Sequence, residues 1–582
     1  MINLFFKIFS FLDKKKKTHF NLIIFFAIIT SFLEMVGIAA ILPIVKIILG
    51  SFDFSNIFLI QYLENLIGFK LSNMQLITTI LTVIFSFFIL KAVVLFFAES
   101  FKLSFLKNVQ DNLSSILYTN YIYIDYQKLS EFKLSEKLRN IGQIGYIITF
   151  LQSCYIMVAD IILSLFIFSF LLIFNFKITL ILVSTLLSIA TIIILLSKNK
   201  LIFYSKVKTK TAAVSMENLI NVLRSLKEVV ILNRRSIFKD QFDHTISTFT
   251  KYEKKNNLLR FFPKVAYEVI ALLLILVVVL FFINQEKNLI ISLENISIFF
   301  VALIKLIPSF NKLVINFQNI NASYFPANEV LNELFLVGKN DSQDNNLIES
   351  KEKNNSFEKI KIENLSFNYN GQKDSILKDI NLEIKKGDII GFYGPSGGGK
   401  STITNLLLGF LKPCKGKVTV NNSEIENNLK GWHKMISYVP QDIFLFNDTI
   451  KNNILFGLDE KEIDKIFFEK VLEISNLNEF LKKTPNGLNT IVGENAMKLS
   501  GGQGQRICIA RSLVKDPEIV VLDEATSKLD EKNEFDILKK LTTKLKKEQT
   551  LIIISHRYNT LRTFSDKVYR VFDKQIKLEY EK

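Results

Sequence analysis

Long apolar stretches with few charges alternate with polar segments in the first half of the chain. Each of the six longest can cross a hydrocarbon core of about 30 Å as a helix that rises about 1.5 Å per residue. The first follows a basic run at 14–17, but it is too long for a cleaved signal peptide and has no small-residue cleavage site. The pattern therefore predicts six transmembrane helices, over 23–48, 77–97, 147–174, 178–196, 265–283 and 289–307.

Positive charge is concentrated on one side of this predicted membrane domain. Lysine and arginine crowd the N-terminal tail and the two long connections 99–144 and 197–262. The short connections near Asn175 and Glu286 carry almost none. This asymmetry follows the positive-inside rule, so we expect the N-terminus and both long connections in the cytoplasm. The formal net charge of +17 then needs no nucleic acid to explain it, because no soluble module interleaves basic and aromatic residues.

The two long connections are helical in composition. Helices that continue beyond the membrane would turn back as hairpins and reach about 25 Å into the cytoplasm. We expect the hairpin tips, near 121–129 and 221–227, to be coupling helices. The outer connection 51–69 has apolar residues at roughly helical spacing. Two interpretations stay open for it, an amphipathic helix at the outer face or an ordinary loop.

A change in composition divides the chain into parts. Hydrophobic residues make up 49% of the 582 residues, and most lie in a predicted membrane domain over 1–335. Residues 336–358 are polar, as in a flexible linker. From 359 to 582, β-rich runs alternate with helical patterns, which is typical of an α/β nucleotide-binding domain. The three cysteines (Cys154, Cys414, Cys508) have no metal-ligand spacing.

A glycine-rich loop follows a predicted strand at 389–393 and precedes a predicted helix at 402–408. This context is that of a phosphate-binding P-loop, whose backbone N–H groups wrap the phosphates. Lys400 is placed to reach the β- and γ-phosphates, and the Ser401 hydroxyl can ligate Mg²⁺. We therefore predict ATP and Mg²⁺ as cofactors. The predicted ATP-binding residues here are Gly394, Pro395, Ser396, Gly397, Gly398, Gly399, Lys400, Ser401 and Thr402.

A second apolar run, 519–522, ends in the adjacent carboxylates Asp523 and Glu524. An aspartate at this place can hold the Mg²⁺ shell, and the glutamate that follows can polarise an attacking water. An exposed acidic strand end would be the purely structural interpretation. The P-loop upstream, at a fitting distance, favours the catalytic one.

Residues 499–503, Leu-Ser-Gly-Gly-Gln, resemble the signature of ATP-binding-cassette proteins. The resemblance implies that four of them contact ATP: Ser500, Gly501, Gly502 and Gln503. It also implies roles for Tyr369 as the aromatic that stacks on adenine and for Gln441 as a Mg²⁺ ligand that links to the membrane domain. By the same resemblance, Glu494 belongs to the loop that senses the opposing subunit, and Asp530 belongs to a dimer-interface loop. His556 resembles the switch histidine at the γ-phosphate.

Three positions depart from the family pattern. Gly504 follows the signature where a longer polar residue is common, and Lys528 replaces a small residue in the interface loop. Residues 495–497 replace a segment that is usually richer in glycine. None of these departures removes a catalytic group, so we expect them to affect rates and not competence.

The family geometry implies a dimer. In this family each ATP lies between the P-loop of one domain and the signature of a second, and this chain has one of each. We therefore expect a homodimer with two equivalent sites. A membrane domain followed by an ATPase domain in one chain resembles the type I exporter arrangement, in which ATP binding turns the helices outward and hydrolysis resets them. The expected location is the bacterial inner membrane, with the ATPase domain in the cytoplasm.

Ionisable residues interrupt the apolar stretches at Glu34, Lys91, Lys264, Glu268 and Lys305. Each costs about 2.5–3.5 kcal/mol at mid-membrane on the insertion scale. Counted along their helices at about 1.5 Å per residue, the three lysines fall at one level near the inner headgroups, with Lys264 opening its helix. Two interpretations stay open. The lysines snorkel to the interface, or they form a basic belt suited to a phosphate or diphosphate headgroup.

The segments 32–34, 262–264 and 305–309, together with Lys91, are similar to PglK-type flippases, which move lipid-linked oligosaccharides for protein glycosylation. That resemblance implies a polyprenyl-diphosphate glycan as substrate and a substrate cavity with Glu34, Lys91, Lys264 and Lys305. Lysine in place of the family's usual arginine loses bidentate phosphate recognition. The alternative function is export of another hydrophobic substrate, a lipid, drug or peptide. An ATP-gated channel would have degenerate catalytic positions, and six spans exclude a soluble cassette ATPase.

Overall fold

The computed structural model describes residues 2–50, 72–124, 126–127, 133–285, 289–338, 356–369, 374–493, 499–544 and 549–582. The chain divides into two compact units. The first comprises Met1–Ile124 and Leu129–Leu347, and the second comprises Asp125–Lys128 and Ile348–Lys582. The outer segment 51–69, most of the predicted linker 336–358 and the loop with Glu494 and 495–497 lie outside the described residues.

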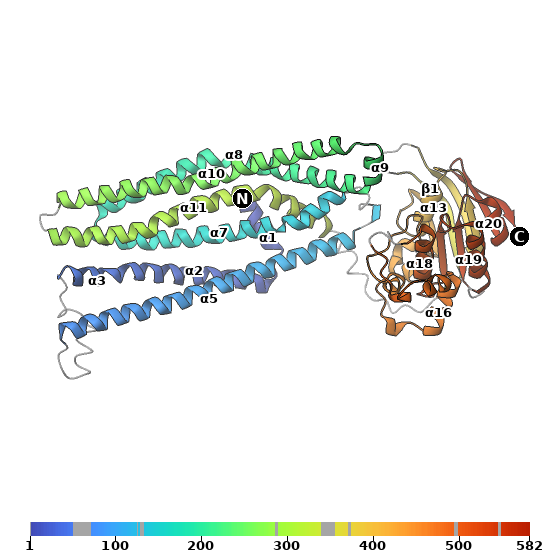
Figure 1. Ribbon diagram of the computed structural model, residues 1–582, viewed down its shortest axis with the longest axis horizontal. Helices are drawn as coiled ribbons and strands as arrows, with labels where there is room; N and C mark the ends of the chain where they lie inside the picture. Colours follow the sequence, from blue (N-terminus) through green and yellow to red (C-terminus); the bar gives the residue numbers. More distant parts are fainter. Residues whose placement is uncertain are drawn as a thin grey trace. The chain divides into compact units, whose positions relative to one another are not determined.

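The first unit is a bundle of long helices (Figure 1). The helices are α1 (Ile2–Ser10), α2 (Lys14–Ala39), α3 (Ile41–Ile48), α5 (Asn73–Ile122), α7 (Leu134–Phe174), α8 (Phe176–Arg224), α9 (Leu226–Ile231), α10 (Arg235–Gln285) and α11 (Leu289–Gly338). Within the described residues, 6 segments are long and apolar enough to cross a membrane. They are Lys14–Ile48, Met74–Ile122, Leu134–Phe174, Phe176–Arg224, Arg235–Gln285 and Ile290–Phe335. The prediction of six transmembrane helices is confirmed.

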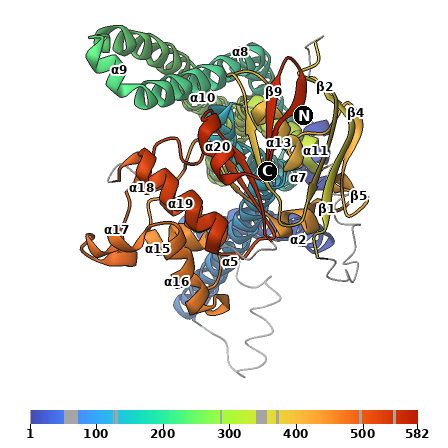
Figure 2. The ribbon, with the colours of Figure 1, turned by 90° about the vertical axis from the view of Figure 1, so that its right-hand side faces the viewer.

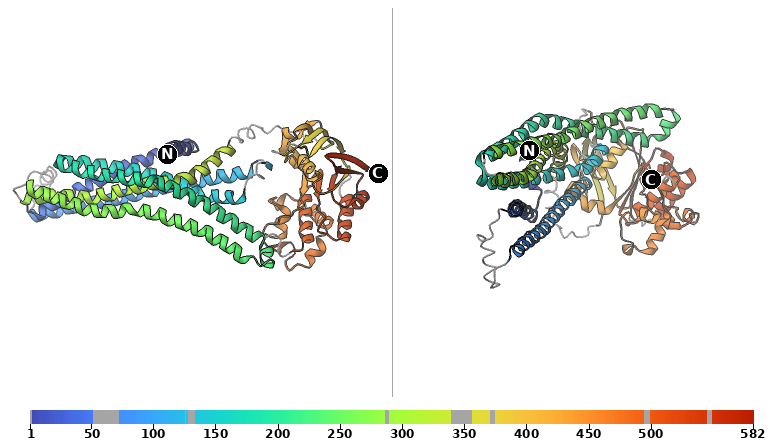
Figure 3. Two further views of the ribbon diagram at one scale, coloured as in Figure 1. Left: turned by 90° about the horizontal axis from the view of Figure 1, so that it is seen from above. Right: turned by 60° about the vertical axis from the view of Figure 1, so that its left-hand side comes forward.

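The helices run well past their apolar stretches, as the long polar connections predict. Helices α8 and α10 lie side by side and are joined through the short helix α9 (Figure 3). The predicted hairpin tip at 221–227 overlaps only the start of α9. Lys264 does not open a helix, because α10 is continuous through Pro263. A proline removes a single backbone hydrogen bond, and long membrane helices tolerate this where neighbouring groups satisfy the freed carbonyl.

Apolar side chains of this unit are buried to very different extents. In the most apolar window of α5 only 6% of the residues are buried inside the chain, compared with 33% in α8. Phe85 and Phe96 of α5 are 68% and 72% exposed. Exposed apolar surface on this scale is covered by lipid or by another protein surface. Helix α5 therefore contributes the least to the interior of the bundle and the most to its outer face.

The second unit contains two sheets (Figure 2). An antiparallel sheet has the order β2-β1-β4-β5, and a larger sheet has the order β10-β9-β3-β8-β7-β6, in which only the β10–β9 pair is antiparallel. The strands are β1 (Lys359–Phe367), β2 (Leu377–Lys385), β3 (Ile389–Tyr393), β4 (Lys415–Val420), β5 (Ser423–Glu424), β6 (Ile436–Val439), β7 (Ile519–Asp523), β8 (Thr550–Ile554), β9 (Lys567–Phe572) and β10 (Gln575–Glu581).

Helices cover the larger sheet, and the predicted α/β class is confirmed. The α-helices are α13 (Lys400–Leu407), α14 (Leu429–Met435), α15 (Ile450–Leu455), α16 (Lys465–Ile474), α17 (Asn478–Lys482), α18 (Gly501–Leu513), α19 (Glu531–Lys544) and α20 (Tyr558–Phe564). The 3-10 helices are η2 (Ile425–Asn428), η3 (Glu460–Glu462) and η4 (Gly487–Asn489).

Strands β7 and β8 are buried at every position. Their side chains alternate between two apolar cores on opposite faces of the sheet: Val520 and Leu522 join one core, whereas Ile519 and Val521 join the other. A parallel sheet with both faces covered accounts for the continuous apolar run at 519–522. The parallel register also brings the carboxyl ends of neighbouring strands to one edge.

Gly416 is required where the two antiparallel strands β1 and β4 change register. Its φ is +76°, and a Cβ atom there would lie 2.3 Å from the carbonyl oxygen of Glu363. The β1–β4 pairing is irregular between Glu363 and Ser366. The position therefore needs both a left-handed backbone and a side chain without Cβ.

We predict that Gly416→Ala lowers the free energy of unfolding of the second unit by about 2 kcal/mol or more. Thermal unfolding of the purified chain and hydrogen exchange in β1 and β4 measure the effect. Gly457→Ala is the matched control, because Gly457 has φ +92° but no atom within 4 Å of its Cβ position. Equal losses in the two variants would show that backbone strain alone, and not the contact with Glu363, accounts for the effect.

Candidate functional site

The P-loop connects β3 to α13, and three of its glycines have positive φ. These are Gly394 (+156°), Gly397 (+77°) and Gly399 (+101°). A Cβ atom on Gly394 would lie 2.2 Å from the carbonyl oxygen of Val571, so the loop packs against β9 where only glycine fits. The loop backbone therefore curls tightly before α13 begins at Lys400.

Lys400 is 7% exposed and lies inside this curl. Its ammonium donates hydrogen bonds to the carbonyl oxygens of Gly394 (2.8 Å) and Pro395 (3.0 Å). Burial lowers the pKa of Lys400, and the nearby carboxylates of Glu524 and Asp523 act in the opposite direction. The loop thus surrounds a cation that faces two acids, which is the arrangement needed to bind an anion together with a divalent cation.

Tyr369, the predicted adenine-stacking residue, follows β1 and lies beside the first turn of α13. Its hydroxyl is 3.4 Å from the hydroxyl of Thr402. Its ring packs edge-on against Phe367, with ring centroids 5.0 Å apart. The structure therefore places this aromatic ring near the P-loop helix, although Tyr369 and Thr402 are 33 positions apart in the sequence.

Asp523 and Glu524 stand at the carboxyl end of β7. Asp523 is 6% exposed, and its carboxylate accepts a hydrogen bond of 3.2 Å from the Tyr438 hydroxyl. Burial raises the pKa of Asp523; the Tyr438 hydrogen bond opposes that rise, and the neighbouring Glu524 charge adds to it. Tyr438 is a site residue that the sequence motifs missed. In the sequence, the one sign of this role is that Tyr438 is an aromatic residue in the strand that ends just before Gln441.

Glu524 is held between two other predicted site residues. Its carboxylate accepts a hydrogen bond of 2.7 Å from Gln441 and lies 2.7 Å from Nε2 of His556. Gln441 follows β6 and His556 follows β8, the two parallel neighbours of β7. Glu524 itself has φ +49°. A left-handed backbone in a non-glycine residue is strained, and such strain clusters where a side chain must be aimed at a site.

The signature begins α18. Ser500 is its N-cap, and the Ser500 and Gln503 side chains form a reciprocal capping box. Gly501 and Gly502 pack against the loop that carries Lys528 and Leu529. Asp530, in the same loop, bonds to Asn533. Within the described residues, no hydrogen bond joins Ser500–Gln503 to the P-loop or to Glu524.

Two of the departures from the family pattern have a packing explanation. A Cβ atom on Gly504 would lie 2.4 Å from Cδ1 of Ile443, so this position has no room for a longer side chain unless Ile443 moves. The aliphatic stem of Lys528 lies over Gly501, within 3.1 Å of its Cβ position. The backbone N–H of Lys528 donates to the side chain of Gln505 at 3.0 Å. Both departures therefore fit the local packing of α18.

The membrane candidates are not all brought together. Lys91 of α5 and Lys305 of α11 each lie 3.0 Å from the same carboxylate oxygen of Glu34 in α2. Lys264 of α10 instead lies 4.0 Å from Glu268, and both side chains are more than half exposed. Among the described residues no ion pair joins Lys264 to Glu34. The ammonium groups of Lys91 and Lys305 thus lie close together, with the carboxylate of Glu34 in contact with both.

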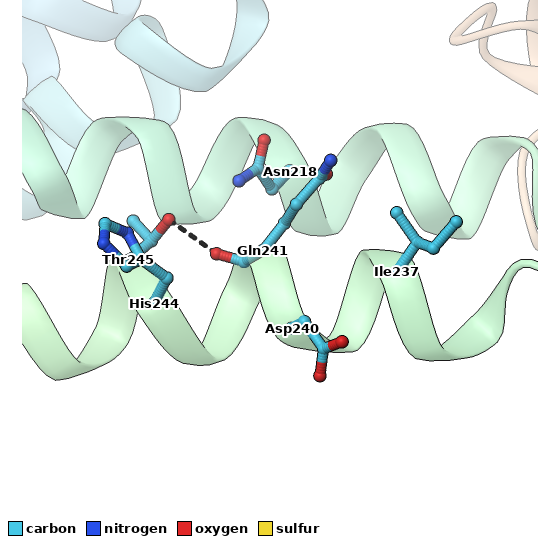
Figure 4. Close-up of a pocket in the computed structure, with 6 residues that line it drawn as sticks. All are labelled: Asn218, Ile237, Asp240, Gln241, His244 and Thr245. Atoms are coloured by element: carbon cyan, nitrogen blue, oxygen red, sulfur yellow. Dashed lines mark hydrogen bonds between the residues drawn. The ribbon is translucent and has the colours of Figure 1, made fainter.

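A separate open depression of about 610 Å³ lies between α8 and α10 (Figure 4). Asn218 of α8 faces it, together with the α10 side chains Ile237, Asp240, Gln241, His244 and Thr245. The Thr245 hydroxyl donates to the Gln241 carbonyl at 2.9 Å within its own helix. No predicted site residue lines this depression.

The burial of Asp523 leads to a prediction about pH. Because its pKa in the folded unit is raised, the charged carboxylate destabilises the fold, and this loss appears as pH rises above the ordinary carboxyl value of about 3.9. We therefore expect Asp523→Asn to raise the unfolding temperature of the nucleotide-free chain at pH 7. The gain should shrink as pH falls toward about 3.9.

Asp530→Asn is the control for this experiment. The Asn533 hydrogen bond lowers the pKa of Asp530, so removing this charge should leave stability at pH 7 unchanged or slightly reduced. A lower unfolding temperature for Asp523→Asn at pH 7 would contradict the prediction. It would mean that the contacts with Tyr438 and Lys400 outweigh the effect of burial.

Comparisons with known proteins agree with this geometry. Residues 377–527 match the family described as ABC transporter. The chain is 43% identical over 204 residues to an ATP-dependent lipid A-core flippase of Wigglesworthia glossinidia brevipalpis, covering 35% of each chain. It is 41% identical over 211 residues to a putative multidrug export ATP-binding/permease protein of Staphylococcus aureus, covering 36% of each. These matches span about a third of the relatives' length.

A solved structure extends the likeness to both units. A bacterial Atm1-family ABC exporter with ATP bound matches with a TM-score of 0.73 over 94% of this chain and 93% of that one, at 20% sequence identity. At that identity the match shows the fold. Residues 377–527 belong to the ABC transporter family, and the chain as a whole is a multi-pass membrane protein with the fold of an exporter-type ABC half-transporter.

Proposed function

We propose that this chain hydrolyses ATP with Mg²⁺ and uses the cycle to move a lipid-linked oligosaccharide of the polyprenyl-diphosphate type across the bacterial inner membrane. One observation carries the ATPase part: the Glu524 carboxylate is held at 2.7 Å by Gln441 and lies at 2.7 Å from His556, next to Asp523 and Lys400. The shared contact of Lys91 and Lys305 with one carboxylate supports a substrate site in the membrane unit.

The proposed ATP chemistry follows from these side chains. Lys400 neutralises phosphate charge, and Ser401 and Asp523 offer the oxygen ligands that Mg²⁺ prefers, with Gln441 beside them. Such a site takes one or two protein ligands and completes the shell with substrate phosphates and water. Mg²⁺ would then stabilise the charge on the transferring phosphoryl group. Glu524 orients and polarises the attacking water, and His556 holds that carboxylate from the other side.

We propose that two copies of the chain assemble and form two ATP sites. The signature residues Ser500–Gln503 have no hydrogen bond to the P-loop among the described residues, so a complete site needs a signature from elsewhere. The exposed apolar surface of α5 offers area for a contact in the membrane. A closed two-fold dimer satisfies both requirements with one interface.

The proposed substrate follows from the charge in the membrane unit. Lys305 interrupts an apolar stretch of α11, and its side chain is exposed. An ammonium there suits an anionic headgroup whose lipid tails remain in the bilayer. One relative named above is called a lipid A-core flippase, and another is called a putative multidrug export ATP-binding/permease protein. An uncharged hydrophobic substrate is the competing proposal.

We predict that Glu524→Gln slows ATP hydrolysis by about 10² or more, because it removes the group that polarises water. ATP binding should persist, since Lys400 and the P-loop are intact. Phosphate release and nucleotide binding by the purified full-length chain measure the two effects. Glu531→Gln, at the exposed start of α19, is the matched control. Wild-type turnover in Glu524→Gln would remove Glu524 from the catalytic step.

We predict that Lys305→Gln and Lys264→Gln each reduce translocation of a polyprenyl-diphosphate glycan in liposomes by about tenfold or more. The loss of one hydrogen bond to a charged group, about 1.5–3 kcal/mol, accounts for this size. The readout is glycan moved per ATP hydrolysed. Lys46→Gln is the control, because Lys46 lies in α3 beside Glu294 at 3.7 Å, apart from the Glu34 contact. Unchanged coupling in both variants, or equal transport of an uncharged lipid, would favour the competing proposal.

A further inference from the structure

Glu34 is the acid that contacts both Lys91 and Lys305 in the membrane unit. One of its carboxylate oxygens lies 3.0 Å from Nζ of Lys91 and 3.0 Å from Nζ of Lys305. The three groups belong to α2, α5 and α11, three helices that are far apart in the sequence. Two cations and one anion leave a formal charge of +1 at this point, instead of the +2 that the lysines alone would provide.

Lys91 is enclosed by α2 and α5. Its side chain is 8% exposed, and its ammonium lies 5.3 Å from the centre of the Phe88 ring. A Cβ atom on Gly37, one turn beyond Glu34, would lie 2.9 Å from the same ammonium. The absence of a side chain at Gly37 therefore makes the room that Lys91 occupies. Glu34, Gly37 and Phe88 together surround the ammonium group of Lys91.

Lys305 differs from Lys91 in accessibility. Its side chain is 45% exposed, whereas that of Glu34 is 19% exposed. A ligand can therefore reach the ammonium of Lys305 directly, whereas that of Lys91 is almost fully enclosed. In surroundings of low dielectric, a carboxylate and an incoming phosphate compete strongly for the same cations.

We propose that Glu34 is an internal counter-ion of the substrate site, and that the anionic headgroup of the substrate competes with it for Lys305 and Lys91. This inference rests on the proposed function, because it assigns the selectivity of that same site. The carboxylate keeps the lysines paired until a ligand with enough negative charge replaces it. A neutral amphiphile gains nothing from displacing Glu34, so the acid makes the site selective for multiply charged headgroups such as a diphosphate.

The test measures binding of farnesyl diphosphate and of farnesol to the purified full-length chain in detergent. Glu34→Gln should lower the dissociation constant for farnesyl diphosphate about tenfold, because the competing charge is gone. Binding of farnesol should not change. Glu34→Asp keeps the charge and should bind both probes as the wild type does. Glu34→Ala is a second neutral variant, should Glu34→Gln fail to fold.

Two further variants separate competition from a merely structural effect. In Glu34→Gln/Lys91→Gln the gain in affinity should disappear, because the released lysine is the source of the gain. Glu294→Gln removes an acid from the pair with Lys46, apart from the proposed substrate site, and it should leave the affinity for farnesyl diphosphate unchanged. A gain of equal size in Glu294→Gln would mean that net charge, and not the position of Glu34, sets the affinity, and this would overturn the inference.

The failure of this inference can be told apart from the failure of the proposed function. If Lys305→Gln weakens binding of farnesyl diphosphate but Glu34→Gln leaves it unchanged or weaker, Glu34 is not a competitor and only the inference falls. If neither substitution changes the binding of farnesyl diphosphate, the membrane lysines do not bind a diphosphate, and the proposed substrate falls with it.

Discussion

The parallel pairing of β6, β7 and β8 determines where the polar groups of the nucleotide site lie. Strands β7 and β8 are buried at every position, and their side chains alternate between two apolar cores. Because both faces are apolar, the register is held by the close packing of each set of side chains within its own core. With the register held, the residues that follow the three strands come together at one edge, and Glu524 meets Gln441 and His556 there.

The membrane unit differs in where its large apolar side chains lie. Its long helices satisfy their own backbone hydrogen bonds, and they expose large apolar side chains where a soluble protein would bury them. In such surroundings an unpaired charge is costly, and Lys91 accordingly lies against Glu34 and the Phe88 ring. Lys305 shares the same carboxylate but remains partly exposed. The charged groups that join α2, α5 and α11 are thus also the groups to which the proposed function assigns an anionic ligand.

The two units show a common use of strain and close contact. Gly394 allows the P-loop to approach Val571, Gly37 allows α2 to accept the head of Lys91, and Gly504 allows α18 to pack on Ile443. In each case the missing side chain leaves room for a neighbour that sequence spacing does not reveal. Glu524 carries its strain in the backbone itself, with φ +49°, and its side chain is thereby directed between Gln441 and His556.

The sequence by itself determined the features that depend on local pattern. Apolar length alone predicted six spans, and the P-loop, the paired carboxylates after 519–522 and the signature at 499–503 were each legible because the chemistry requires these residue types at fixed spacing. Tertiary structure alone decided which distant groups meet. The spacing of 57 residues between Glu34 and Lys91 carries no local signal, and neither does the contact of Tyr438 with Asp523, 85 residues away. Lys264 shows the same limit: its depth along the chain matched that of the other lysines, but among the described residues its ion pair is with Glu268 in its own helix and not with Glu34. Depth follows from the rise of one helix, whereas the direction of a side chain depends on how several helices pack.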